Sequence, residues 1–302
     1  MGAPFHYHLF GLTLRSTIEL PELIPAQGNG DCDVEITRGK VAGAQDEGFG
    51  VTETGAMLTI PGVARYEVSG GSQILVDAAL GAGDANVRLY LLGSVMGALL
   101  HQRGMLPLHA NAIEIDGLAV AFMGPSGAGK STLAAAFHDR GFAVLADDIC
   151  VIGAAQGKVM AYPGVPRLRL WEEALHASGR ASEPYQLSYA GDEDYRKFDI
   201  PVEGRIEGLP LAGLFLLAKG DRLSFRPLGG AEAAAAVFGN TYRGALVETA
   251  GDPLGHWSAS MALLTSMPVI EVQRAWDLTE IPGNIDPIVE YVRPRLQCPS
   301  RH

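Results

Sequence analysis

Eight residues near the middle of the chain have the types and the spacing of a phosphate-binding loop. The segment Gly124-Pro-Ser-Gly-Ala-Gly-Lys-Ser131 matches the pattern G-x-x-x-x-G-K-[ST]. Glycines at these places let successive backbone N–H groups point inward at phosphate oxygens, helped by the positive end of the following helix. Lys130 is expected to reach the β- and γ-phosphates, and the hydroxyl of Ser131 to bind Mg²⁺. The residues expected to contact a nucleoside polyphosphate are Gly124, Pro125, Ser126, Gly127, Ala128, Gly129, Lys130, Ser131 and Thr132.

The segments on either side of this loop favour a strand before it and a helix after it. Residues 118–123 form a short, unbroken apolar run, which is typical of a buried strand. Residues 132–138 are rich in Ala and Leu and favour a helix. An ordinary glycine-rich turn is the alternative, but strand, loop and helix together are the context that the phosphate-binding motif requires.

A pair of adjacent carboxylates follows the next apolar run. Asp147 and Asp148 come directly after residues 142–146, which predict a second buried strand. A carboxylate at such a strand end is where enzymes with this loop hold Mg²⁺ or its bound water. Two carboxylates allow one to face the metal while the other accepts a proton from an incoming hydroxyl. Two solvated loop aspartates are the alternative interpretation.

His109 is expected near this site. The dipeptide Asp116-Gly117 between two apolar runs predicts a hairpin, which pairs the strand containing His109 with the strand that enters the loop. A histidine in an apolar stretch is also typical of a core position, and both interpretations stay open.

A γ-phosphate also needs positive charge from outside the loop. Each basic side chain taken singly is more typical of surface charge, but Lys197 and Arg243 stand beside aromatic or small residues typical of packed loops. We therefore carry Lys197 and Arg243 as candidate catalytic residues. The full set of basic candidates is Arg167, Arg169, Arg196, Lys197 and Arg243.

Composition narrows the class of protein. The formal charge of −11 over 302 residues argues against a general nucleic-acid binder, which needs a positive surface. No apolar run reaches eighteen residues, so no membrane span is expected. Cys32, Cys150 and Cys298 are few, odd in number and far apart, which indicates reduced thiols of a cytoplasmic protein.

The pattern along the chain predicts two domains. Residues 1–84 alternate short β-like runs with turn residues and predict a small β-rich domain with a structural or partner-binding role. A strong, largely apolar helix is expected over residues 86–103. Residues 85–302 then form the expected catalytic domain, with strands near 212–218 and 223–228 and helices near 230–239, 256–267 and 283–292.

The central segment resembles the catalytic domain of the HPr kinase/phosphorylase family. The likeness rests on His109, the loop 124–131, the helix end Arg140-Gly141 and the sequence Ala146-Asp147-Asp148, in the family's order and spacing. The resemblance implies a mixed α/β fold with a P-loop kinase core of the phosphoenolpyruvate-carboxykinase-like type, ATP and Mg²⁺. It further implies that Asp147 assists the metal and that Asp148 accepts the proton of a serine hydroxyl.

The chain also departs from that family. Its Glu-Ile-Arg-Gly segment is absent, with residues 166–171 near that place, and its Pro-Gly-Arg-Asn signature is missing. The segment that starts at Phe10 is similar to the N-terminal domain of HPr-kinase-related proteins from peptide natural-product pathways. Among these are kinases of lasso-peptide precursors, which act on a C-terminal serine.

The expected function is therefore an ATP-dependent serine kinase whose acceptor is a small protein or peptide. HPr(Ser) kinase/phosphorylase and a catalytically silent nucleotide-sensing module remain alternatives, and a homo-oligomer is compatible with the resemblance.

Overall fold

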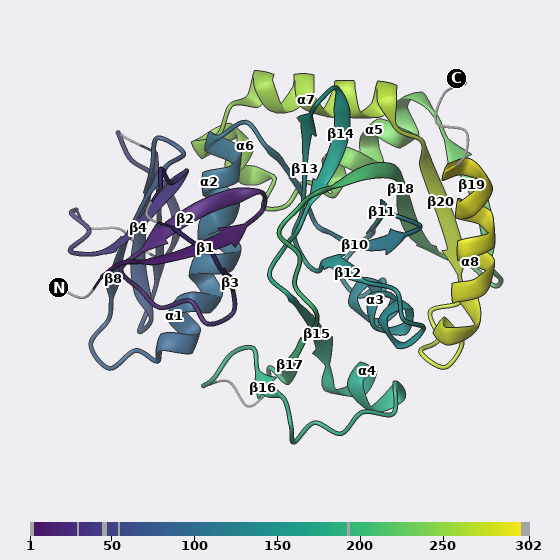
Figure 1. Ribbon diagram of the computed structural model, residues 1–302, viewed down its shortest axis with the longest axis horizontal. Coiled ribbons are helices and arrows are strands. Elements are labelled where there is room, and N and C mark those ends of the chain that lie inside the picture. The colour runs from purple at the N-terminus through teal and green to yellow at the C-terminus, as the bar shows by residue number, and fades with distance from the viewer. Residues whose placement is uncertain (1–2, 29, 44–46, 54, 192–193, 297–302) are drawn as a thin grey trace.

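A computed structural model describes residues 3–28, 30–43, 47–53, 55–191 and 194–296 of the chain. The described part has a mixed α+β fold with two large sheets and one small sheet. Helix α2 (Met96–Gln102) lies between the two large sheets, because it contacts a strand of each (Figure 1). Cys298 lies outside the described residues.

The first large sheet holds the N-terminal strands. Its order is β3-β1-β2-β4-β8-β7-β6-β5, with β2–β4 and β4–β8 parallel and the other pairs antiparallel. Apolar residues alternate along its strands and bury one face against the helical segment that follows. The strands are β1 (Phe5–Leu9), β2 (Leu12–Ser16), β3 (Ile24–Pro25), β4 (Val34–Arg38), β5 (Gly48–Val51), β6 (Gly55–Ile60), β7 (Ala64–Ser69) and β8 (Gln73–Ala78).

The helix expected over residues 86–103 is present but is not uniform. It runs as α1 (Asp84–Tyr90), a π-helical turn η1 (Leu91–Val95) and α2. Such turns widen a helix locally and occur often at functional sites. Gly93 in η1 lines the pocket described below. The domain boundary near residue 85 stays a prediction.

The second large sheet carries the glycine-rich segment 124–131. Its order is β12-β10-β11-β18-β14-β13-β9, with β20 beside β18 and β19 beside β20. The predicted hairpin is confirmed: β10 and β11 pair antiparallel, and Asp116 and Gly117 both have positive φ, as a tight hairpin turn requires. The strands are β9 (Leu106–Leu108), β10 (Ala110–Ile115), β11 (Leu118–Met123), β12 (Val144–Ala146), β13 (Cys150–Ala155), β14 (Lys158–Tyr162), β18 (Leu209–Lys219), β19 (Ser224–Leu228) and β20 (Val269–Arg274).

Helices cover both faces of this sheet. Side chains of β11 alternate between the two cores: Val120 and Phe122 pack with α3 (Lys130–Asp139) and α8 (Ile281–Leu296), whereas Ala121 faces α5 (Gly230–Gly239) and α7 (Pro253–Ser266). The expected helices near 230–239, 256–267 and 283–292 are therefore confirmed. Helix α6 (Ala245–Ala250) packs on α2 and α7, and the sequence pattern did not predict it.

A small three-stranded sheet stands below the second large sheet (Figure 1). Its order is β15-β17-β16, from β15 (Arg167–Trp171), β16 (Gln186–Leu187) and β17 (Lys197–Pro201), and α4 (Glu172–Ala177) follows β15. Strand β15 contacts α3, so this sheet lies beside the helix that follows the glycine-rich segment 124–131.

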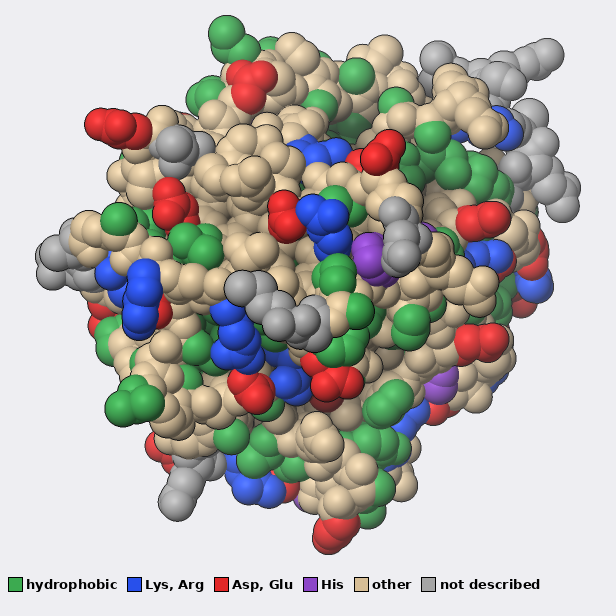
Figure 2. Space-filling model, turned by 60° about the vertical axis from the view of Figure 1, so that its left-hand side comes forward, with side chains coloured by type: hydrophobic (Ala, Val, Ile, Leu, Met, Phe, Trp, Pro, Cys, Tyr) green, Lys and Arg blue, Asp and Glu red, His purple; other side chains and the backbone are tan. Residues whose placement is uncertain are grey.

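The surface in Figure 2 mixes both signs of charge. Basic and acidic side chains are interspersed on this face and leave apolar residues between them. None of the helices in the described ranges combines the length and the apolar character needed to cross a membrane.

Candidate active site

The glycine-rich segment forms a loop between a buried strand and a helix, as predicted. Strand β11 ends at Met123, and α3 begins at Lys130. Gly127 and Gly129 have φ of +82° and +78°, values that only glycine adopts at low cost. The N–H groups of the first turn of α3 have no intrahelical partner, so this helix end offers donors to an anion.

Three polar side chains from distant segments hold the loop in place. Arg274 at the end of β20 donates from Nη2 to the carbonyl of Ala128 at 2.7 Å. The N–H of Gly124 donates to Oδ1 of Asn240 at 2.9 Å, and Nδ2 of Asn111 donates to the carbonyl of Lys130. Arg274 reaches the loop because β11, β18 and β20 are parallel, so their carboxyl ends meet at one edge of the sheet.

Lys130 is folded back onto its own loop. Its Nζ donates to the carbonyls of Gly124 at 2.7 Å and Pro125 at 3.2 Å. Burial lowers the pKa of Lys130 to about 8. These carbonyls are weak partners for a buried ammonium, so a polyphosphate would offer it a stronger one.

Asp147 faces the start of α3. Its Oδ1 accepts a hydrogen bond from Oγ of Ser131 at 2.9 Å, and its Oδ2 accepts one from the N–H of Arg169 at 2.8 Å. Burial raises the pKa of Asp147, and the charge of Asp148 adds to the effect. The structure therefore brings together the hydroxyl and the carboxylate that the sequence assigns to a metal.

Asp148 points to different partners. Its backbone has φ of +73°, so the chain turns sharply between the two acids. One carboxylate oxygen lies 3.3 Å from Nη1 of Arg169, and the other lies 3.4 Å from Nδ1 of His109. Burial acts to raise the pKa of Asp148, but the charges of Arg169 and Lys197 outweigh it and hold that pKa below the usual 3.8.

His109 does reach the site, although it does not lie within a strand. It occupies the break between β9 and β10. Its Nδ1 is 3.2 Å from the carbonyl of Asp148, and burial, with the charge of Lys130, lowers its pKa below 6.5. A neutral His109 can therefore donate to this carbonyl and help hold the strained backbone of Asp148.

Arg167 and Arg169 are not surface residues, and the expectation of surface charge for them is wrong. Their side chains are 15% and 10% exposed. Asp199 of β17 lies between them, at 2.6 Å from Nη1 of Arg167 and 3.4 Å from Nε of Arg169. Arg169 and Asp199 are direct partners in the β15–β17 register, so strand pairing builds this network.

The other basic candidates differ in their surroundings. The charge of Lys197 acts on Asp147 and Asp148, and its Nζ lies 5.8 Å from the ring centre of Trp171. Arg243 has φ of +50°, and its guanidinium group lies over the ring of Tyr242. Burial raises the pKa of Tyr242, and the charge of Asp148 adds to the effect. Arg196 instead forms an exposed ion pair with Glu172.

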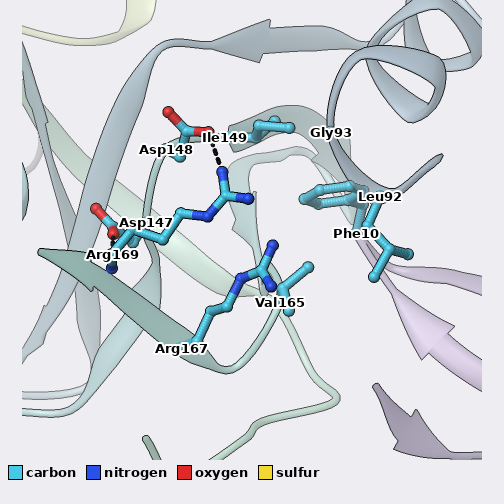
Figure 3. Close-up of a pocket in the computed structure, with 9 residues that line it drawn as sticks. All are labelled: Phe10, Leu92, Gly93, Asp147, Asp148, Ile149, Val165, Arg167 and Arg169. Atoms are coloured by element: carbon cyan, nitrogen blue, oxygen red, sulfur yellow. Dashed lines mark hydrogen bonds and ion pairs between the residues drawn. The ribbon is translucent and has the colours of Figure 1, made fainter. Parts of the chain in front are cut away.

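A pocket opens beside the two acids and joins both large sheets. Its walls come from the β1–β2 turn, from η1, from the acidic pair and from β15 (Figure 3). The lining residues are Phe10, Leu92, Gly93, Asp147, Asp148, Ile149, Val165, Arg167 and Arg169.

The chemistry of these groups fits a polyphosphate with Mg²⁺. Ser131 and Asp147 supply oxygen ligands, and Mg²⁺ in such sites takes one or two carboxylates, substrate phosphates and water. In the ranges that the structure describes, no three His, Cys, Asp or Glu side chains cluster to hold a metal by themselves.

Several site residues were missed because they come from segments far from the motif. Arg274 ends β20, Asn240 follows the end of α5, and Asp199 lies in the middle of β17, and long-range pairing brings them to the site. A signal for the strands that carry two of them did exist: residues 197–201 and 269–274 alternate polar and apolar residues, as half-buried strands do.

Comparison with known proteins finds likenesses among solved structures. No protein-family model matches the chain, and the search of curated proteins found no match. The chain is similar to the structure of the HPr(Ser) kinase/phosphatase from Coxiella burnetii, with 13% sequence identity and a TM-score of 0.33, over 64% of this chain and 99% of that one.

Proposed function

We propose that the chain is an ATP-dependent serine kinase whose acceptor is a small protein or peptide. The observation that carries the proposal is the hydrogen bond of 2.9 Å from Ser131 to Asp147. It joins the start of α3 to the acidic pair, so a phosphate chain on the loop would end beside Asp148. A lasso-peptide precursor is the particular acceptor that the N-terminal resemblance implies.

The residues divide the work of phosphoryl transfer. The loop N–H groups and Lys130 hold the phosphates and neutralise their charge. Ser131 and Asp147 would hold Mg²⁺, which shields the charge that develops on the transferred group. Lys197 and Arg169, whose charges lower the pKa of Asp148, would add positive charge from outside the loop.

Asp148 has the surroundings of a proton acceptor. The acceptor hydroxyl gives its proton to Asp148, its oxygen bonds to the γ-phosphorus, and the bond to the bridging oxygen breaks, so that ADP leaves with the electron pair. The lowered pKa of Asp148 keeps it ionised at neutral pH. A weak base suffices because the transition state is loose and positioning matters more than basicity.

The test is transfer of labelled γ-phosphate to serine-bearing peptides, with Asp148→Asn as the diagnostic variant. We expect Asp148→Asn to keep ATP binding and to lower transfer by about 10²- to 10⁴-fold. Asp286→Asn is the matched control, since Asp286 pairs with Arg140 on the surface. ATP binding with no transfer to any acceptor would instead favour a nucleotide-sensing module.

A further inference from the structure

The pocket beside Asp148 has two walls of opposite character. Phe10, Leu92 and Val165 make one wall apolar, whereas the guanidinium groups of Arg167 and Arg169 form the other. Figure 3 shows both guanidinium groups directed from β15 toward the side chain of Phe10. The pocket therefore presents a paired cation to whatever enters it next to the acidic pair.

Arg169 has a donor without a partner in this pocket. Its Nη1 is directed to Asp148, but its Nη2 is buried and has no hydrogen-bond partner among the residues that the structure describes. Leaving a charged donor buried and unpaired is costly, so such a group calls for an explanation. Arg167 uses one Nη for Asp199 and makes no other side-chain hydrogen bond within the described ranges.

We propose, building on the proposed function, that this pocket binds an oxyanion of the acceptor. The anion is a carboxylate or a phosphate that lies close to the hydroxyl to be phosphorylated. Guanidinium groups match both anions, because their N–H donors form a planar fork. Arg169 bridges the two events, since one nitrogen orients Asp148 and the other is left for the anion.

Phe10 limits what can enter beside the anion. It lies in the β1–β2 turn with φ of +55°, and its N–H donates to the carbonyl of Pro163 at 2.9 Å. The next residue, Gly11, is held against the ring of Tyr162, where a Cβ would come within 2.5 Å of a ring carbon. The first large sheet thus supplies a fixed apolar wall, which favours a compact acceptor group.

The test compares three small probes that differ in their anion: N-acetylserine, its neutral amide, and glycerol 1-phosphate. Binding is measured by calorimetry without ATP, and transfer is measured separately with labelled ATP. We expect at least one anionic probe to bind about tenfold or more tighter than the amide. A preference for N-acetylserine assigns a carboxylate, and a preference for glycerol 1-phosphate assigns a phosphate.

Variants of Arg167 test whether the preference for anionic probes arises in this pocket. Arg167→Met should abolish the preference for the anion over the amide, whereas Arg167→Lys should retain part of it. Arg205→Met is the matched control, because Arg205 pairs with Glu114 outside the pocket. Thermal melting checks that each variant folds, and if Arg167→Met does not, Arg167→Lys alone must weaken anion binding.

Failures of the two proposals are distinguishable. Equal binding of the acid, the phosphate and the amide overturns the oxyanion pocket even where serine peptides are phosphorylated. Tight anion binding that depends on Arg167, with no transfer to any acceptor, supports the proposed oxyanion pocket and contradicts the proposed kinase function.

Discussion

The guanidinium group of Arg274 donates a hydrogen bond of 2.7 Å to the carbonyl of Ala128, although the two residues lie 146 positions apart. Arg274 is 1% exposed, and its other Nη donates to the carbonyl of Ala275 at 2.9 Å. A buried cation from a distant strand therefore helps to fix the shape of the glycine-rich loop 124–131. The loop is not held by its own sequence alone.

Arg274→Met should weaken nucleotide binding, with a smaller effect on the free energy of unfolding. Methionine keeps most of the side-chain volume but removes the donor to Ala128, and a hydrogen bond of this charged kind contributes about 1.5–3 kcal/mol. We expect the Kd for a non-hydrolysable ATP analogue to rise about tenfold or more. Arg226→Met, at an exposed site on β19, is the control. An unchanged Kd in Arg274→Met would contradict this role.

Alanine substitutions at two glycines of the loop test how closely Arg274 packs against it. Gly127 and Gly129 have nearly equal positive φ, so alanine brings a similar strain of about 1–2 kcal/mol at either position. A Cβ on Gly127 meets nothing within 4 Å, whereas one on Gly129 comes within 2.6 Å of Nη2 of Arg274. Gly129→Ala should therefore lower the free energy of unfolding more than Gly127→Ala does, as measured by urea denaturation.

A double-mutant cycle tests the origin of that difference. In an Arg274→Met background the clash with Nη2 is gone, so Gly129→Ala should cost about as much as Gly127→Ala. If the two alanine substitutions lower the free energy of unfolding equally in the parent chain, the close approach of Arg274 to Gly129 makes no contribution to stability.

Ser131 and Asp147 should act as one unit toward Mg²⁺. Their hydrogen bond of 2.9 Å places both oxygens together, so removing either leaves the other badly placed. Ser131→Ala and Asp147→Asn should each raise the Mg²⁺ concentration for half-maximal transfer about tenfold, and the double variant should cost less than the product of the two. Ser266→Ala on α7 is the control. If the two substitutions multiply in their effects on the Mg²⁺ concentration for half-maximal transfer, Ser131 and Asp147 act independently and this prediction is wrong.

Local patterns predicted the motif and its neighbours well. The apolar run 118–123, the hairpin residues Asp116 and Gly117, and the acidic pair after β12 each depend on residues close in sequence. Strand alternation and turn chemistry act over a few residues, so a single sequence is enough to find them.

The parts that were missed depend on pairing across the chain. Arg169 looks like surface charge until β15 pairs with β17, which places Asp199 opposite it. Arg274 has no local signal for a role at the loop, because its place follows from the parallel register of β18 and β20. No window of sequence contains both partners of either contact.

His101 predicts how stability depends on pH. Its side chain is 3% exposed, its Nε2 lies 2.8 Å from the carbonyl of Tyr242, and burial lowers its pKa below the usual 6.5. Below pH 6.5 the unfolded chain binds a proton at His101 that the folded chain does not, so the free energy of unfolding falls as pH falls. This histidine contributes a slope of at most about 1.4 kcal/mol per pH unit.

His101→Gln isolates this contribution, since the amide can still donate to Tyr242 but does not titrate. Between pH 6.5 and lower values we expect the variant to lose less stability per pH unit than the parent, as measured by urea denaturation at several pH values. His176→Gln, on the exposed face of α4, is the matched control and should keep the parent slope. A parent slope retained in His101→Gln would assign the acid sensitivity to other groups, such as the half-buried His109 and the buried His256, whose pKa values are also lowered.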